Sequence, residues 1–256
     1  MSSEPSKYHL YCENAAHIDG WFTDQAAALW DCLLSYQDAN SIRGNLLEIG
    51  VHKGKSALLS AMHTRCDEEQ FLIDVAPLND ATDLIRRVCP DTKLRTFEQP
   101  SRLMRRLPFF SEMASSFRWI HIDGGHTAQD VTTDLEIAHQ LLADDGVVSL
   151  DDFFSFPFPQ VTAATFSFMA AHPHTFALVL GGFAKGYLCR PLMVKQYLTY
   201  IKDCLPADMS VRGHERFTLW KTTLPSDMNT FGITDRFEGF DTQFFGLVSD
   251  ISDVQI

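Results

Sequence analysis

The chain has 256 residues, of which 45% are apolar and 21% are charged, a composition typical of a folded protein with a substantial core. Its 33 acidic and 21 basic residues give a net charge of −12, which opposes binding to nucleic acid or to an anionic membrane surface. The six cysteines form no CxxC pair, and neither a signal-like leader nor a membrane-spanning apolar run is present, so we expect a cytoplasmic protein without a zinc site or disulfide scaffold.

Helical and strand-like segments alternate along most of the chain. Residues 23–36 carry apolar side chains at helical spacing, which predicts an amphipathic helix ahead of the main domain. Strands are then expected at 45–50, 70–75, 92–97, 118–123 and 147–150. Further helices are expected at 55–63, 81–88, 103–107, 127–142 and 161–173. Short strands alternating with helices predict an α/β fold with a central, mostly parallel sheet flanked by helices.

Acidic residues stand where four of the five predicted strands end. These residues are Glu48, Asp74, Asp123, Asp151 and Asp152. In an open parallel sheet, ligands bind outside the carboxyl ends of the strands. An aspartate at such a position is also a common helix cap, so the pattern by itself leaves both interpretations open.

The loop after the first predicted strand contains two glycines, in the order E-x-G-x-x-x-G-x-S from Glu48 to Ser56. Glycine lets the backbone approach a ligand, and the N–H groups that begin the next helix favour an anion. The spacing is neither that of the GxxxxGK[ST] phosphate loop nor that of the GxGxxG dinucleotide loop. It resembles motif I of the class I methyltransferases that use S-adenosylmethionine (SAM). A glycine turn in an unrelated α/β enzyme is the alternative interpretation.

This resemblance implies a Rossmann-like class I methyltransferase fold and a set of SAM-binding residues. In that family the loop holds the methionine half of SAM, and the acid after the second strand, here Asp74, accepts hydrogen bonds from the ribose hydroxyls. Gln99 or Ser101, after the third strand, would contact the adenine, and His52 stands where the catechol branch carries a tyrosine. The predicted cofactor-binding residues are Glu48, Gly50, His52, Gly54, Ser56, Asp74, Gln99, Ser101 and Asp123.

A second group of residues indicates a cation site. Asp123 ends the fourth predicted strand in the run H-I-D-G-G-H, and Asp151 and Asp152 end the fifth. If the two strands are neighbours, three carboxylates converge and repel one another unless a cation neutralises them. Oxygen donors with room for water favour Mg²⁺, with Mn²⁺ or Ca²⁺ as substitutes. The alternative is that these aspartates only cap a turn and a helix.

The spacing of these acids resembles that of the metal-dependent O-methyltransferases of the catechol type. In that family two adjacent ligands follow the first by 28 and 29 residues, as Asp151 and Asp152 follow Asp123 here. The surrounding residues look closer still to the macrocin O-methyltransferase-like branch, which methylates sugar hydroxyls and other natural-product alcohols. The resemblance implies that these three aspartates bind the metal and that His126 is the general base. For His126 the alternative is a polar residue at a helix start without a chemical role.

Together these residues predict the Mg²⁺-dependent transfer of a methyl group from SAM to a hydroxyl of a small natural product, either a sugar or a phenol. A metal-dependent oxygenase-like or hydrolytic enzyme that uses the same carboxylates is the alternative, and SAM binding distinguishes the two. A non-catalytic SAM-binding domain is a third class, against which the complete set of acids and His126 argues. The expected partner is a small hydroxyl acceptor, and a homo-oligomer is compatible with the sequence.

Three regions are expected along the chain. Residues 1–40 form a helical extension or lid, 41–195 the SAM-binding core, and 196–256 a region that completes the sheet and serves as a lid or an oligomer contact. Phenylalanine is concentrated in the last 104 residues, which hold 14 of the 20. We expect most of these rings in the core, and Phe153 and Phe154 beside a substrate pocket.

Overall fold

Parallel strands form the centre of the sheet. The computed structural model describes residues 6–108, 110–221 and 229–235, and its first five strands pair in parallel. They are β1 (Asn45–Ile49), β2 (Glu69–Asp74), β3 (Lys93–Glu98), β4 (Phe117–Ile122) and β5 (Leu142–Asp151). Each of them overlaps the strand predicted at its position.

The later strands extend this sheet beyond β5. They are β6 (Ala177–Gly182), β7 (Lys185–Cys189), β8 (Phe217–Lys221) and β9 (Phe231–Asp235). Within the described residues the strand order is β3-β2-β1-β4-β5-β7-β6-β9-β8, and only β7 and β8 run antiparallel to their neighbours. The predicted α/β fold with a mostly parallel sheet is confirmed. From β1 the chain adds β2 and β3 on one side of the sheet and then β4 and β5 on the other. Open α/β sheets bind ligands at this switch point, between β1 and β4.

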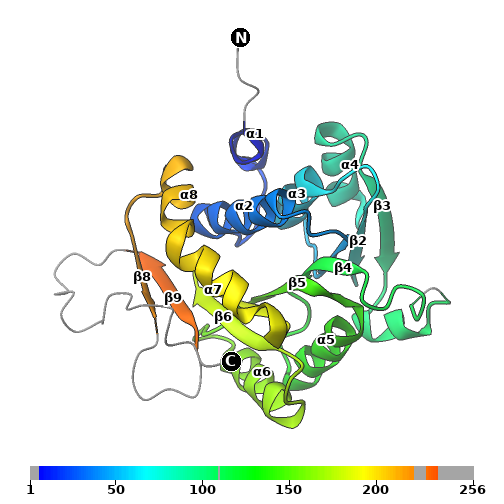
Figure 1. Ribbon diagram of the computed structural model, residues 1–256. Coiled ribbons are helices and arrows are strands. Elements are labelled where there is room, and N and C mark those ends of the chain that lie inside the picture. Colours follow the sequence, from blue (N-terminus) through cyan, green and yellow to red (C-terminus); the bar gives the residue numbers. More distant parts are fainter. Residues whose placement is uncertain (1–5, 109, 222–228, 236–256) are drawn as a thin grey trace.

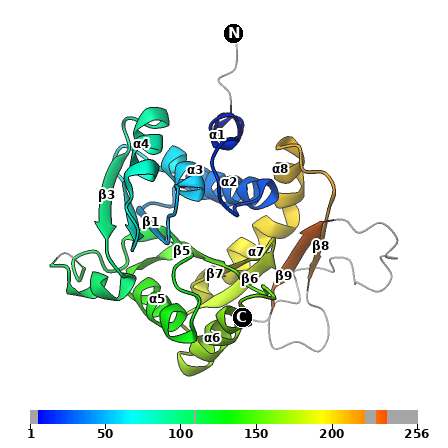
Figure 2. The same ribbon diagram turned by 180° about the vertical axis from the view of Figure 1, so that it is seen from behind.

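Helices cover both faces of the sheet (Figures 1 and 2). One face carries α5 (Ala128–Leu141) and α6 (Pro159–Ala171). The other carries α2 (Asp24–Ala39), α3 (Lys55–His63), α4 (Asn79–Val88), α7 (Val194–Asp203) and α8 (Leu205–Val211), with α1 (Lys7–Ala15) packed outside α2 and α3. Two short 3₁₀ helices, η1 (Ser101–Arg106) and η2 (Pro191–Met193), complete the described elements. The helix predicted at 103–107 is therefore a 3₁₀ turn.

Side chains of β4 alternate between the two layers of the core. Trp119 packs edge-on against Trp30 of α2 with ring centroids 5.1 Å apart, and His121 contacts the same ring at 4.5 Å. Ile120 and Ile122 point to the opposite layer, which the apolar residues of α5 and α6 complete. The alternation places His121 on the α2 side of the sheet, one position before the strand ends.

A buried arginine ties α2 to the sheet. Arg118 of β4 is fully buried and donates to both carboxylate oxygens of Glu68, from Nε at 2.9 Å and from Nη2 at 3.0 Å. Its Nη1 donates to Oε1 of Gln37 at 2.9 Å, and Nη2 also donates to the backbone carbonyl of His63 at 2.7 Å. Because these partners come from α2, from the end of α3 and from the residue before β2, one guanidinium joins three neighbouring segments to β4.

Most of the described phenylalanines after β5 belong to the core. Phe153, Phe168, Phe176 and Phe231 are buried, whereas Phe154 is 59% exposed. The remaining rings of the predicted tail, Phe237, Phe240, Phe244 and Phe245, lie outside the described residues. Within the described part of the chain, the helices are too short or too polar to cross a lipid bilayer.

Candidate active site

A cavity of about 950 Å³ lies at the carboxyl ends of the parallel strands. The loops that follow β1 to β5 form its walls. From the predicted sites, its lining includes Gly50, His52, Asp74, Gln99, Ser101, Asp123, His126, Asp151 and Asp152. Other lining residues, which no sequence motif indicated, include Trp21, Val75, Gln129, Thr133, Ser155, Phe158 and Ala184. One cavity thus joins the glycine loop to the acid cluster.

The glycine loop after β1 is held by a carboxylate from the next strand. Val51 and His52 donate their backbone N–H groups to Oδ2 of Asp74 at 2.7 and 2.9 Å, and a third backbone N–H group donates to Oδ1 at 2.8 Å. Gly50 has a φ of 84°, and a Cβ there would overlap the backbone carbonyl of Asp123. Glycine is therefore required where the loops after β1 and β4 touch.

Three predicted cofactor residues, Glu48, Gly54 and Ser56, are not among the residues that line the cavity. Ser56 donates a hydrogen bond to buried Glu48 at 2.5 Å. Gly54, with a φ of 81°, packs so closely on Ala81 of α4 that a side chain would not fit. All three support the loop from behind, and their contact with SAM stays a prediction.

The acids after β4 and β5 meet at one end of the cavity. Ligand-type atoms of Asp123, His126 and Asp152 lie within 4.8 Å of one another. Nε2 of His126 is 2.9 Å from Oδ2 of Asp152 and 3.7 Å from Oδ1 of Asp123. The imidazole stacks on Phe158 with ring centroids 4.1 Å apart, which restricts its orientation. Two of the predicted metal ligands and the predicted base are therefore neighbours.

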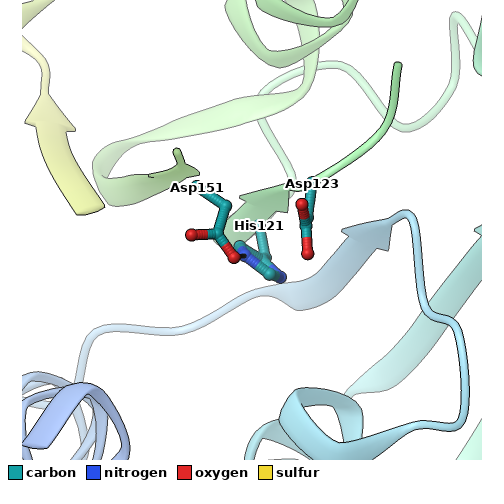
Figure 3. A group of neighbouring side chains, drawn as sticks. All are labelled: His121, Asp123 and Asp151. Carbon is teal, nitrogen blue, oxygen red and sulfur yellow. Dashed lines mark ion pairs between the residues drawn. The ribbon is translucent and has the colours of Figure 1, made fainter. Parts of the chain in front are cut away.

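Asp151 belongs to a second group of side chains that lies deeper in the sheet. Figure 3 shows the ring of His121 between the carboxylates of Asp123 and Asp151, and ligand-type atoms of these three residues also lie within 4.8 Å of one another. Nδ1 of His121 is 3.4 Å from Oε1 of Glu48, and Nε2 is 3.9 Å from Oδ2 of Asp151. Nζ of Lys185, on β7, lies 2.6 Å from the same Oδ2. His121 is the first residue of the H-I-D-G-G-H run but was assigned no role, and no motif indicated Lys185.

Charge and burial shift the pKa values in this cluster. Burial, together with repulsion from Asp151, raises the pKa of Asp123 to about 6. Burial also disfavours the charged form of Asp151, but Lys185 and His121 outweigh it and lower the pKa of that carboxyl. Contact with Asp123 raises the pKa of His126. A bound cation stabilises carboxylates that repel each other, so the oxygens of Asp123 and Asp152 suit a hard divalent cation.

Helix capping does not account for Asp123. Thr127 caps α5, and its Oγ1 accepts a hydrogen bond from the backbone N–H of Asp130 at 3.2 Å. Asp123 precedes this cap by four residues and lines the cavity instead. Asp151 does take part in a local turn, because its Oδ1 accepts the backbone N–H of Asp152 at 2.8 Å. The capping interpretation therefore fails for Asp123 and describes only part of what Asp151 does.

Residues 47–153 match the family model described as a methyltransferase domain. Among solved structures, the chain is similar to CalS11, a TDP-rhamnose 3'-O-methyltransferase of calicheamicin biosynthesis, with 16% identity and a TM-score of 0.51 over 63% of this chain and 78% of that one. It is also similar to the O-methyltransferase NovP, with 14% identity and a TM-score of 0.50 over 64% and 80% of the two chains.

A third similar structure is the SAH-bound methyltransferase PaMTH1 of Podospora anserina, with 16% identity and a TM-score of 0.52 over 73% of this chain and 88% of that one. No curated protein matches the chain in sequence.

Asp134 of α5 is a buried acid beside the site, and the sequence analysis assigned it no role. Its side chain is fully buried, and neither carboxylate oxygen has a hydrogen-bond partner. The carboxylate packs against Gly124 in the loop after β4, so closely that a Cβ on this glycine would lie 2.8 Å from Oδ2 of Asp134. Burial raises the pKa of Asp134 to about 7.

The raised pKa of Asp134 should make the protein less stable as the pH rises. The unfolded chain releases this proton near pH 3.9 and the folded chain near pH 7, so the folded state binds more protons between these values. The free energy of unfolding should therefore decrease by on the order of 3 kcal/mol between pH 4 and pH 8. Asp134→Asn removes this contribution and should be more stable than the wild type at pH 8.

Urea denaturation at pH 5 and pH 8 measures the difference. The control is Asp83→Asn, which changes an exposed aspartate on α4 and should follow the wild-type profile. If Asp134→Asn showed the same pH dependence as the wild type, Asp134 would not titrate in this range.

The matched domain begins within β1 and ends just after the acid pair, so it includes the glycine loop, Asp123, His126 and both aspartates that end β5. The three solved structures share the fold of the chain. The roles of single residues are not tested by these similarities and stay predictions. Residues 47–153 thus match a methyltransferase domain, and the chain has the Rossmann-like fold of known O-methyltransferases that the resemblance predicted.

Proposed function

We propose that the protein transfers the methyl group of SAM to a hydroxyl of a small organic molecule. The transfer uses a divalent cation, for which Mg²⁺ is the first candidate. The observation that best supports this proposal is the single cavity that extends from Gly50 in the glycine loop to Asp123, His126 and Asp152. A methyl donor at the loop and a hydroxyl at the acids would share one space, as an in-line displacement requires.

SAM, in this proposal, binds along the loops after β1, β2 and β3. Gly50 leaves room for the methionine half, and Asp74 takes the ribose. Three backbone N–H groups already donate to Asp74, so the ribose would use the acceptor position that remains. Nε2 of Gln99 is buried without a hydrogen-bond partner, which gives the adenine a donor, with Ser101 beside it.

The acceptor hydroxyl would lie at the acid cluster. Nε2 of His126 accepts its proton, and the carboxylates of Asp152 and Asp123 stabilise the imidazolium that forms. A divalent cation held by Asp123 and Asp152 would lower the pKa of the hydroxyl and fix the position of its oxygen. Mn²⁺ or Ca²⁺ could replace Mg²⁺ because the donors are carboxylate oxygens.

The proposed acceptor is a sugar or phenol hydroxyl of a natural product. CalS11, which shares the fold, is a TDP-rhamnose 3'-O-methyltransferase, and NovP is an O-methyltransferase. The cavity wall offers two aromatic faces for such a ring, since Trp21 and Phe158 both line it and the indole of Trp21 is 89% exposed.

Calorimetric titration of the purified protein with SAM, with and without Mg²⁺, tests the cofactor part of this proposal. We expect SAM to bind, and we expect radiolabelled methyl groups to appear on one member of a panel of sugars and phenols. A protein that bound Mg²⁺ but not SAM would instead support a hydrolytic or oxygenase-like enzyme.

Chelation tests the role of the cation. EDTA should abolish methyl transfer, and added Mg²⁺ should restore it, because an un-ionised aliphatic hydroxyl is a poor nucleophile without a Lewis acid. SAM should still bind to the chelated protein, since its proposed contacts lie at the other end of the cavity. Full activity after thorough chelation would reject the metal role.

A further inference from the structure

Lys185, the first residue of β7, carries an ammonium group inside the protein. The residue is 2% exposed, and Nζ lies 5.2 Å from the ring centroid of Phe22 and 5.9 Å from that of Trp30. Two aromatic faces stabilise a cation only in part, so a buried ammonium also needs a negative partner. That partner is Asp151, with Nζ 2.6 Å from Oδ2.

The backbone holds this ion pair in place. In the antiparallel pairing of β5 with β7, Asp151 stands opposite Lys185. Phe153 donates its N–H to the carbonyl of Ala184 at 3.0 Å, and its ring packs over Gly186, where a Cβ would have no room. The distance between the ammonium and the carboxylate is therefore set by the sheet and by the turn that follows β5.

Both carboxylate oxygens of Asp151 are engaged within the protein. Oδ2 contacts Lys185, and Oδ1 accepts the backbone N–H of Asp152. By contrast, the ionic neighbour of both Asp123 and Asp152 is His126, at the cavity wall. Once Lys185 balances the charge of Asp151, two negative charges remain to balance one divalent cation.

We propose that Lys185 is a positioning residue that occupies Asp151 and confines the cation to Asp123 and Asp152. This inference rests on the proposed function and deepens it. Of the three aspartates that the sequence assigns to the metal, two bind it directly, and the third holds an internal ammonium. The ammonium also keeps a metal ion out of the deeper group around His121, because two positive charges at contact distance repel strongly away from water.

Electron paramagnetic resonance of free Mn²⁺ tests this assignment on the full chain, since it reports metal binding without turnover. Asp152→Ala should weaken Mn²⁺ binding by about 10-fold or more, because it removes a ligand oxygen. The double variant Asp151→Ala/Lys185→Met removes one negative and one positive charge together, and its Mn²⁺ affinity should stay within about 3-fold of the wild type. Lys185→Met alone leaves Asp151 unpaired and should bind Mn²⁺ about 10-fold more tightly.

Two outcomes would overturn the assignment. If the double variant lost as much Mn²⁺ affinity as Asp152→Ala, Asp151 would be a ligand. If Lys185→Met bound Mn²⁺ with the affinity of the wild type, Lys185 would have only a structural role. Circular dichroism checks the fold of each variant, and the double variant keeps the test valid if Lys185→Met fails to fold. A wild type without Mn²⁺ binding would reject both this inference and the metal part of the proposed function. A wild type that binds Mn²⁺ and SAM but methylates no acceptor would reject only the proposed function.

Discussion

The His126→Ala variant should transfer methyl groups about 10²- to 10⁴-fold more slowly than the wild type. Nε2 of His126 lies at the acid end of the cavity, 2.9 Å from Oδ2 of Asp152, and in the proposed mechanism it accepts the proton of the acceptor hydroxyl. The side chain is 35% exposed, so its loss should change the thermal midpoint little. Single-turnover measurement of methyl transfer at saturating SAM and Mg²⁺ gives the rate.

The matched control is His172→Ala, which removes an exposed imidazole after the last turn of α6 and should keep the wild-type rate. Calorimetry should find the same SAM affinity in His126→Ala as in the wild type. A parallel loss of SAM affinity and rate would indicate a misfolded site, and a rate within about 3-fold of the wild type would remove His126 from the mechanism.

Arg118→Met should lower the free energy of unfolding by about 3–5 kcal/mol. The variant leaves the carboxylate of Glu68 buried without one of its two guanidinium partners, and it also removes the donor to Gln37 that fastens α2 to the sheet. Urea denaturation monitored by tryptophan fluorescence measures the change, because Trp30 and Trp119 lie in the adjoining core.

Arg95→Met is the comparison for this prediction. Arg95 of β3 also pairs with a glutamate, Glu69, with Nε 2.9 Å from the carboxylate, but its side chain is 44% exposed. Exposed pairs of this kind contribute less than about 1 kcal/mol. Equal losses in the two variants would show that burial does not determine the contribution of Arg118.

Much of the fold was predictable because individual segments carry their own patterns. The apolar residues that recur at helical spacing over 127–142 predict α5, and in the structure the helix begins one residue later, with Thr127 as its cap. α1 was not predicted as a separate helix, since the apolar residues of Lys7–Ala15 form no clear stripe. None of the strands β6 to β9 was located either, and the pairing of β7 with β5 and of β9 with β6 depends on contacts between segments far apart in the chain.

The acids of the site were predictable for a different reason. Parallel neighbouring strands bring their carboxyl ends to one edge, so Asp123 and Asp152 had to meet if β4 and β5 were adjacent. The contact of Lys185 was not predictable, because Lys185 stands 34 positions after Asp151 and the contact depends on β7, rather than β6, lying next to β5. A lysine within an otherwise uncharged strand, as in KGYLC, is the signal that could have indicated a buried ion pair.

The turn between β6 and β7 consists of Phe183 and Ala184, both with positive φ values of 51° and 59°. A two-residue turn fixes the register between the two strands that it connects. Adding or removing a single residue there would shift β7 by one place against β5, and Ala184 or Gly186 would stand opposite Asp151. The length of one hairpin, and not only the choice of side chains, therefore determines which side chain stands opposite Asp151 behind the acid end of the cavity. Attempts to alter acceptor choice should accordingly leave this hairpin intact and vary the segment 154–157, of which Ser155 and Pro157 line the cavity.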